Sequence, residues 1–501
     1  MIDGQIAPLA CLGELTDEPV DQTGPTRSFV YIDISSIDRD TKRIFAAKSM
    51  EAHQAPSRAR QVLKTGDVLV SMTRPNLNAV AVVPTELDGA IASTGFHVLR
   101  SRWLRPQYLY RLVQTRDFIE AMTAAVQGAL YPAVRPKDID AYRLTFHTPN
   151  QQERIVDKLE ELLSDLDAGV AELDAARKKL ERYRQALLKA AVEGALTAEW
   201  RAGNPPSETG AQLLQRILTE RRARWEAGQL AKFEQQGKAP PKNWKDKYVE
   251  PAKPDVSDLP MLPEQWVWTS LGECFQVLVG ATPSRKETRY WGGPIPWVSS
   301  GEVRFTRIKG TRETITQAGL ENSSTRINPA GSVLLGMIGE GKTRGQVAIL
   351  DMPAANNQNC AAIWVSETPA PPEYVFSWLW SQYEQTRRGS SGNNQPALNK
   401  SIVERVVMPL PPLAEMQEIV RLVDHALDQI ERQHSAIDHA LRHSAAQRQN
   451  ILRAAFAGEL VPQDPDDEPA SVLLARIRAQ RAAQAEEKKP RRTKARKAAD
   501  A

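Results

Sequence analysis

The strongest constraint on this chain is that it carries one segment twice. Residues 184–196 read RQALLKAAVEGAL, and residues 448–460 read RQNILRAAFAGEL, 264 positions later (448 − 184). Seven of the thirteen aligned positions are identical, where unrelated sequences would share about one. We therefore expect two similar helical regions that alternate with two globular regions.

The helical regions carry the apolar spacing of a coiled coil. Their apolar residues recur at alternating steps of three and four, although His434 and Ser444 interrupt the stripe in the second region. The predicted seam residues are Ile155, Leu159, Leu162, Leu166, Leu173, Leu180, Ile419, Val423, Ile430, Ile437 and Ile451. A helix of about 42 residues is roughly 60 Å long, which is too long for the surface of a small domain. We expect the two helices to pair in antiparallel fashion around a pseudo-two-fold axis.

The globular regions show short β-branched runs broken by Pro and Gly, which predict mixed α+β domains. In the first region we expect strands at 29–34, 67–71 and 79–83 and a helix at 106–125. The second region repeats this order, and residues 332–337 correspond to residues 67–72. The offset drifts in these regions, which indicates surface loops of different length on a shared scaffold.

A chain of 501 residues is too long for a single core. We predict six segments: a globular domain at 1–148, a long helix at 149–200, a short amphipathic helix and a Lys/Pro-rich linker at 201–260, a second domain at 261–411, a second long helix at 412–462, and a short helix with a basic disordered tail at 463–501. The tail carries seven cations at 488–497. A solubilising end and weak phosphate contact explain such a tail equally well.

The totals favour a soluble intracellular protein. Three cysteines give no disulfide framework, which is typical of the reducing cytoplasm, and neither a signal segment nor an 18-residue apolar run occurs. A formal charge of +4 decides nothing by itself.

Motifs for catalysis are missing from the sequence. There is no GxSxG or HExxH, and the glycine-rich stretch at 336–341, which with Lys342 and Thr343 spells GxxxxGK[ST], lacks the following helix that such a phosphate-binding loop needs. His439 and His443 lie four residues apart, but solvent-facing histidines explain this better than a metal site, since no third ligand is near in the sequence. We therefore expect no catalysis and no metal in this chain.

Several sequence segments resemble the specificity (S) subunits of type I restriction-modification enzymes. They are LPEQWVW at 262–268, LPPLAEMQEIV at 410–420, YRQALLKAAVEGAL at 183–196 and AFAGEL at 455–460. The resemblance extends over essentially the whole chain, and the order of the domains is its most specific part. The first copy departs from the pattern, since it lacks the LPExW opening and enters its helix through TPNQQER at 148–154.

The resemblance implies two target recognition domains, each of which reads one half of a bipartite DNA site. The coiled coil would set the spacer and dock two methyltransferase (M) subunits, with restriction/translocase (R) subunits joining through them. S-adenosylmethionine, ATP and Mg²⁺ would belong to those partners, and the M subunit would flip and methylate adenine. This chain would be the non-catalytic, DNA-binding subunit.

Base recognition needs side chains that distinguish base edges, chiefly Arg, Lys, Asn and Gln. Such residues follow equivalent strands in both copies. The candidates are Arg74, Asn76, Asn78, Gln127, Tyr131, Arg135 and Lys137 in the first domain, and Lys342, Arg344, Gln346, Arg387, Arg388, Asn393, Asn394, Gln395 and Lys400 in the second. A single polar loop is more often a solvent-facing turn, but the recurrence in both copies makes base reading an equal alternative.

Two other functions compete with this hypothesis. A coiled-coil structural adaptor, whose end domains bind protein partners, would need apolar or aromatic loops, where this chain has polar and basic ones. A stand-alone nuclease is disfavoured because the sequence shows no metal-binding carboxylate cluster.

Overall fold

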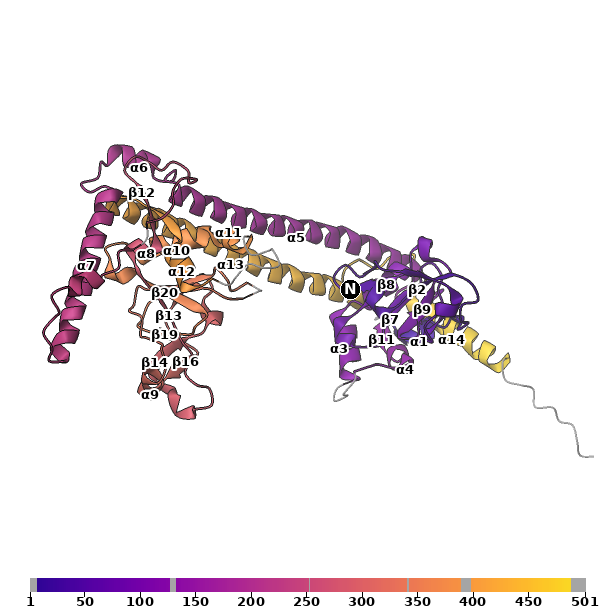
Figure 1. The fold of residues 1–501 in the computed structure, drawn as a ribbon. Helices are drawn as coiled ribbons and strands as arrows, with labels where there is room; N and C mark the ends of the chain where they lie inside the picture. The colour runs from indigo at the N-terminus through magenta and orange to yellow at the C-terminus, as the bar shows by residue number, and fades with distance from the viewer. Residues whose placement is uncertain (1–6, 127–131, 252, 340–341, 389–397, 488–501) are drawn as a thin grey trace, which may run out of the picture. The chain divides into compact units, whose positions relative to one another are not determined.

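The computed structural model describes residues 7–126, 132–251, 253–339, 342–388 and 398–487. Contacts divide the chain into two compact units, residues 1–175 with 437–501 and residues 176–436. Each unit contains one globular domain together with parts of the two long helices α5 (Pro149–Val192) and α13 (Leu413–Ala457), which Figure 1 labels.

Three β-sheets are common to the two domains. In the first domain they are β1 (Leu9–Cys11) with β11 (Arg143–Thr145), β7 (Val68–Ser71) between β10 (Phe96–Leu99) and β8 (Val80–Val82), and β2 (Phe29–Ile32) between β5 (Lys48–Met50) and β9 (Ile91–Ser93). In the second they are β12 (Val267–Ser270) with β21 (Val407–Leu410), β17 (Val333–Gly336) between β20 (Cys360–Trp364) and β18 (Val347–Leu350), and β14 (Trp291–Val298) between β16 (Glu313–Ile315) and β19 (Ala355–Asn356).

The strand directions match as well as the strand order. All these pairs are antiparallel except β2–β9 and β14–β19, which are parallel in both copies. The central strands β7 and β17 are buried at every position, which explains why both read as continuous apolar runs. Additional strands distinguish the copies: β3 (Ile37–Asp38), β4 (Arg43–Ile44) and β6 (Ala59–Val62) in the first, and β13 (Gln276–Val279) and β15 (Thr306–Ile308) in the second. The sequence repeat is therefore a structural repeat, and the predicted α+β fold class is confirmed.

The predicted helix at 106–125 is wrong in one respect, because it is two helices. α2 (Pro106–Leu112) ends before Thr115, and α3 (Arg116–Ala124) starts after it. The Thr115 hydroxyl accepts a hydrogen bond from Phe118 N, and an N-cap of this kind begins a new helix.

The long helices run antiparallel in each unit. In the first unit the beginning of α5, with Ile155 and Leu159, shares a core with Leu452 near the end of α13. In the second unit the end of α5, with Leu188, shares a core with Ile419 at the start of α13. Each helix stops at a glycine with positive φ, Gly194 at 76° and Gly458 at 80°, which are 264 positions apart (458 − 194).

The burial of the predicted seam differs between the two long helices. Ile155, Leu159, Ile419, Val423, Ile430 and Ile437 are buried, whereas Leu162, Leu166, Leu173, Leu180 and Ile451 are half-buried. At the ends the domains cover the helices and shift the buried stripe, so that Leu163 is buried in place of Leu162 and Leu452 beside Ile451. The middle of α13 stays buried at Ile430 and Ile437, whereas the middle of α5 is half-buried from Leu166 to Leu180.

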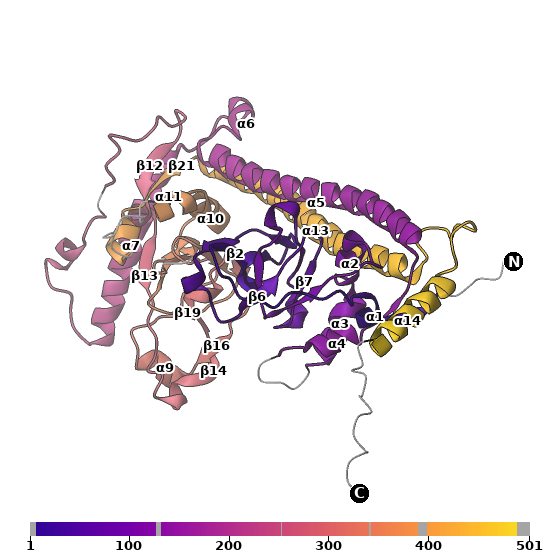
Figure 2. The same ribbon diagram turned by 90° about the vertical axis from the view of Figure 1, so that its right-hand side faces the viewer.

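A shorter helix follows each long one and packs on a domain. α7 (Gly210–Gln235) contributes Leu213 and Ile217 to the core of the second domain, and α14 (Ala470–Glu487) contributes Leu473 and Ile477 to that of the first. Both are longer than the short helices predicted within 201–260 and 463–501, since α7 has 26 residues and α14 has 18. Figures 1 and 2 show α14 beside α1 (Leu12–Leu15), where Arg481 donates to the carbonyl of Gly13.

The Lys/Pro-rich linker after α7 contains an aromatic cluster that the sequence prediction missed. Trp244, in the short 3₁₀ helix η5 (Trp244–Lys247), stacks on Trp225 of α7 with ring centroids 5.9 Å apart. Tyr248 packs edge-on against the same Trp225 at 5.2 Å. The segment therefore folds back on α7, because three aromatic rings offset the cost of ordering it.

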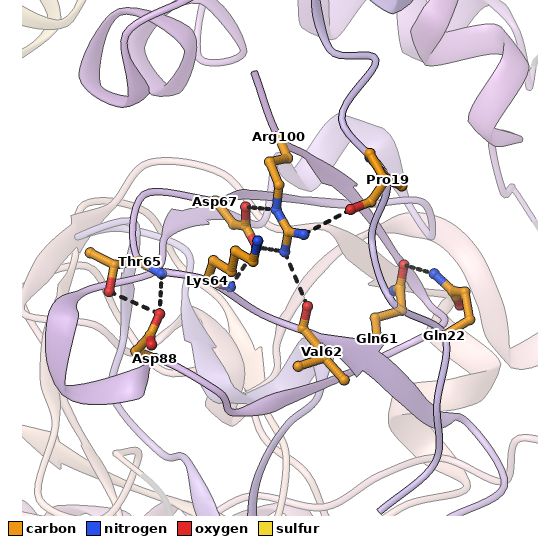
Figure 3. A network of polar contacts seen from close by, with 9 residues as sticks. All are labelled: Pro19, Gln22, Gln61, Val62, Lys64, Thr65, Asp67, Asp88 and Arg100. Atoms are coloured by element: carbon orange, nitrogen blue, oxygen red, sulfur yellow. Dashed lines mark hydrogen bonds and ion pairs between the residues drawn. The ribbon is translucent and has the colours of Figure 1, made fainter. Parts of the chain in front are cut away.

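Buried carboxylates join distant segments in each unit. In the first domain Arg100 binds Asp67 through two hydrogen bonds of 2.7 and 2.6 Å, and its remaining N–H groups reach the carbonyls of Pro19 and Val62 (Figure 3). In the second unit Glu415 of α13 accepts hydrogen bonds from Arg201 Nε at 2.8 Å and from Trp266 Nε1 at 2.8 Å. Trp266 belongs to the LPEQW motif, so this motif fixes the second domain to the start of α13.

Candidate nucleic-acid interface

In the first domain the candidate loop after β7 is a rigid turn. The 3₁₀ helix η3 (Pro75–Leu77) lies between Arg74 and Asn78, both left-handed, with φ of 49° and 45°. Such backbone angles are uncommon for residues other than glycine and persist only where the surroundings enforce them. The side chains of Arg74 and Asn76 are exposed at the tip of this turn.

Asn78 does not belong to the exposed surface. It is 8% exposed, and its Nδ2 donates to the carbonyl of Val113 at 2.8 Å. Its own carbonyl accepts from Lys42 Nζ at 2.6 Å, and burial lowers the pKa of Lys42. The prediction that Asn78 reads bases is therefore corrected, since its amide holds the turn against the domain.

The two candidate segments of the first domain lie next to each other. Val134 N donates to the carbonyl of Met72 at 2.8 Å, and Arg74 N donates to the carbonyl of Pro132 at 2.9 Å. The second domain has the same connection, because Leu398 N donates to the carbonyl of Met337 at 3.2 Å. These pairs occupy equivalent positions of the repeat, so each domain presents its two candidate segments as one surface.

The rest of the first-domain set is exposed or outside the described residues. Arg135 pairs with Asp138 at 3.0 Å, and this hydrogen bond lowers the pKa of Asp138. Lys137 is exposed on α4 (Pro136–Asp140). Gln127 and Tyr131 lie outside the residues that the structure describes.

In the second domain the loop at 342–346 is held by a helix. Tyr383, the first residue of α11 (Tyr383–Arg388), donates its hydroxyl to the carbonyl of Lys342 at 2.8 Å. Lys342 is exposed, and Arg344 and Gln346 are half-buried. The Nε of Arg344 is buried without a hydrogen-bond partner among the described residues. An arginine in that state favours a ligand that brings an acceptor.

The second segment of this domain is only partly described. Arg387 lies over the ring of Tyr383, 5.4 Å from its centroid, and Lys400 pairs with Glu404 in α12 (Lys400–Glu404) at 3.5 Å. The side chain of Arg388 and the residues Asn393, Asn394 and Gln395 fall outside the described part.

Sequence reasoning missed the residues that hold these loops. α3 packs under η3 in the first domain, as α11 packs under the loop at 342–346 in the second. Tyr383 and its neighbour Phe305 show no pattern in the sequence that marks them, because their contacts join segments far apart in the chain.

Among the residues that the structure describes, no group of three or more His, Cys, Asp or Glu side chains is placed to hold a metal ion. None of the helices described is both long and apolar enough to cross a membrane.

Comparison with known proteins relates the chain to one family. Residues 263–438 match the model of the type I restriction modification DNA specificity domain. The chain is similar to specificity subunits of type I restriction-modification enzymes over most of its length. The EcoDI specificity subunit of Escherichia coli is 24% identical over 410 residues, which cover 79% of this chain and 81% of that protein. The EcoKI specificity subunit of Escherichia coli K12 is 26% identical, with coverage of 75% and 71%.

Solved structures share the fold of this chain. A chain solved in a study of complex assembly and conformational transition of the type I R-M system superposes with a TM-score of 0.69 at 23% identity, covering 91% of this chain and 98% of the other. The HsdS subunit from Thermoanaerobacter tengcongensis gives a TM-score of 0.53, also at 23% identity and with the same coverage. A specificity subunit is the non-catalytic part of its enzyme, in agreement with the expectation from the sequence.

Proposed function

We propose that this chain is the specificity subunit of a type I restriction-modification enzyme and selects a bipartite DNA site, with each globular domain reading one half. The observation that carries the proposal is the repeated surface in which a reading loop and a second polar segment meet through one backbone hydrogen bond. Double-stranded DNA is the direct partner. Two M subunits dock on the helices, R subunits join through them, and S-adenosylmethionine, ATP and Mg²⁺ act in those subunits.

Three of the candidate residues carry charges that no ion pair with a described residue satisfies, which supports base contact. Arg74, Lys342 and Arg344 form no ion pair with any described residue, so their charges are not already satisfied within the protein. Arginine commonly binds the O6 and N7 edge of guanine with two hydrogen bonds, and each good bidentate pair contributes about 1–3 kcal/mol of discrimination.

The helix pair supports a fixed spacer between the half-sites. In the first unit Arg448 pairs with Asp167, and in the second His434 lies 3.3 Å from Glu181. The residue numbers add to 615 in both cases (448 + 167 and 434 + 181), so one antiparallel register describes both units. We infer that a helix pair in constant register sets the length of unread DNA between the half-sites.

The experiment replaces Arg344 by alanine in the complex with M subunits and measures methylation of DNA libraries randomised in each half-site. We expect preference at one base of the second half-site to fall by about tenfold or more, since one bidentate contact is lost. The first half-site should not change. Arg326→Ala, at an exposed arginine of the same domain, is the matched control. Unchanged preference at every base would reject Arg344 as a reader, and methylation without any two-part preference would reject the function.

A further inference from the structure

The hydroxyl of Tyr383 joins the two candidate segments of the second domain. It donates to the carbonyl of Lys342 at 2.8 Å and accepts from Arg387 Nη1 at 3.1 Å. Lys342 belongs to the loop before β18, and Arg387 lies one turn further along α11. One side chain therefore connects residues that are 45 positions apart (387 − 342).

The ring of Tyr383 is fixed in place from the other side. Phe305 packs against it edge-on, with centroids 4.9 Å apart, and stacks on Trp380 at 5.0 Å. Phe305 has a left-handed backbone with φ of 54°, and its N–H donates to the carbonyl of Val347 at 2.8 Å. A bulky residue with positive φ is a true outlier, and outliers of this kind persist where packing enforces them and cluster at functional sites.

The loop also lies directly on α11. Gly345 has φ of 80°, and a Cβ atom there would lie 3.2 Å from Tyr383 Cδ2 and 3.4 Å from Thr386 Cγ2. A side chain at this position would be strained by the backbone angle, and its Cβ atom would require the Tyr383 ring to move by a few tenths of an ångström. The absence of a Cβ thus lets the loop that carries Lys342 and Arg344 touch the ring that carries the hydroxyl.

We propose that Tyr383 is a positioning residue that sets the loop at 342–346 and Arg387 as one rigid reader of the second half-site. This inference rests on the proposed function. Recognition of a base edge requires a side chain held within about half an ångström of its productive geometry, and Arg344 has no ion pair among the described residues to hold it. Because the Tyr383 hydroxyl donates its hydrogen bond to the Lys342 carbonyl, it acts on recognition through the loop.

The test uses the full complex with M subunits and the variant Tyr383→Phe, which keeps the ring and removes the two hydrogen bonds. Methylation of libraries randomised in each half-site is read by sequencing. We expect discrimination at the second half-site to fall by about three- to tenfold, which corresponds to the net contribution of one hydrogen bond. The first half-site, in the same molecule, should keep its preference.

Tyr374→Phe is the matched control, because it also removes a tyrosine hydroxyl from this domain. The Tyr374 hydroxyl is buried and donates to the carbonyl of Pro409 at 2.9 Å. This variant should leave both preferences unchanged. A second readout is coupling: if Tyr383 acts through the loop, Tyr383→Phe should add less than about twofold to the loss caused by Arg344→Ala, because coupled residues are not additive.

Three results would overturn the inference. They are equal losses at both half-sites, an unchanged second half-site in Tyr383→Phe, and full additivity with Arg344→Ala. The proposed function would survive each of them if the wild-type complex still modifies a two-part site. Methylation by the wild type without any two-part preference would instead reject the proposed function, and this inference with it.

Discussion

Replacing Asp67 by alanine should destabilise the first domain far more than a surface change would. The Asp67 side chain is 2% exposed and that of Arg100 8%, and their two hydrogen bonds measure 2.7 and 2.6 Å. Asp67 also accepts from Lys64 N at 2.8 Å. Without the carboxylate, the buried guanidinium keeps the carbonyls of Pro19 and Val62 as its hydrogen-bond partners among the described residues (Figure 3).

The magnitude follows from burial. Removing one member of a buried ion pair costs about 3–5 kcal/mol, because the other charge stays uncompensated. This is a large part of the roughly 5–15 kcal/mol that stabilises a whole domain. Arg285 and Glu313 make a similar two-bond pair in the second domain, but the Arg285 side chain is 54% exposed. Breaking an exposed pair by Glu313→Ala should cost only about 0–1 kcal/mol.

Native-state hydrogen exchange of the full-length chain separates the two domains in one measurement. In Asp67→Ala, peptides from β7 and β10 should exchange about a hundredfold faster, which corresponds to about 3 kcal/mol. Peptides from β17 and β20 should not change. The double variant Asp67→Leu with Arg100→Met should recover most of the loss, because it removes both charges. A change below about threefold in β7, or no recovery in the double variant, would refute the argument from uncompensated charge.

Two further predictions concern pH and the helix pair. Burial lowers the pKa of His147 to about 4, so the folded domain favours the neutral side chain. Its contribution to the free energy of unfolding is complete above about pH 6.5, the pKa of histidine in the unfolded chain. About 3 kcal/mol of this contribution is lost as the pH falls from 6.5 through 4. His147→Asn should flatten this dependence in denaturant titrations, and an unchanged slope would contradict it. Deleting about four residues of α5 around Gly169 removes roughly 6 Å of helix. Sequencing of methylated sites should then show a changed spacer or no methylation. Altered half-sites with the old spacer would contradict the proposal that the helix pair sets the spacer.

The sequence was sufficient to predict what depends on local pattern and repetition. Apolar spacing gave both long helices, and β-branched runs marked the strands around β2, β7 and β8. The errors have two sources. Thr115 splits a predicted helix through a local cap that the apolar spacing does not show, whereas Asn78 is held inward by the carbonyl of Val113, 35 residues away in the chain. The hydrogen bond from Tyr383 to Lys342 depends on packing between segments 41 residues apart in the chain. No periodic pattern in the sequence predicts such a contact.

Each half of the repeat also contributes a helix to the domain of the other half. The coiled-coil pattern alone did not predict this exchange. Leu213, Ile217 and Arg221 of α7 correspond to Leu473, Ile477 and Arg481 of α14 at a constant offset of 260 (473 − 213), not 264. Arg221 donates to the carbonyl of Gly272 and Arg481 to that of Gly13. The helix that follows α5 thus completes the second domain, and the helix that follows α13 completes the first. Buried leucines of α14 belong to the core of the first domain. The segment after 460 is therefore part of this domain, and the basic tail begins only after that segment.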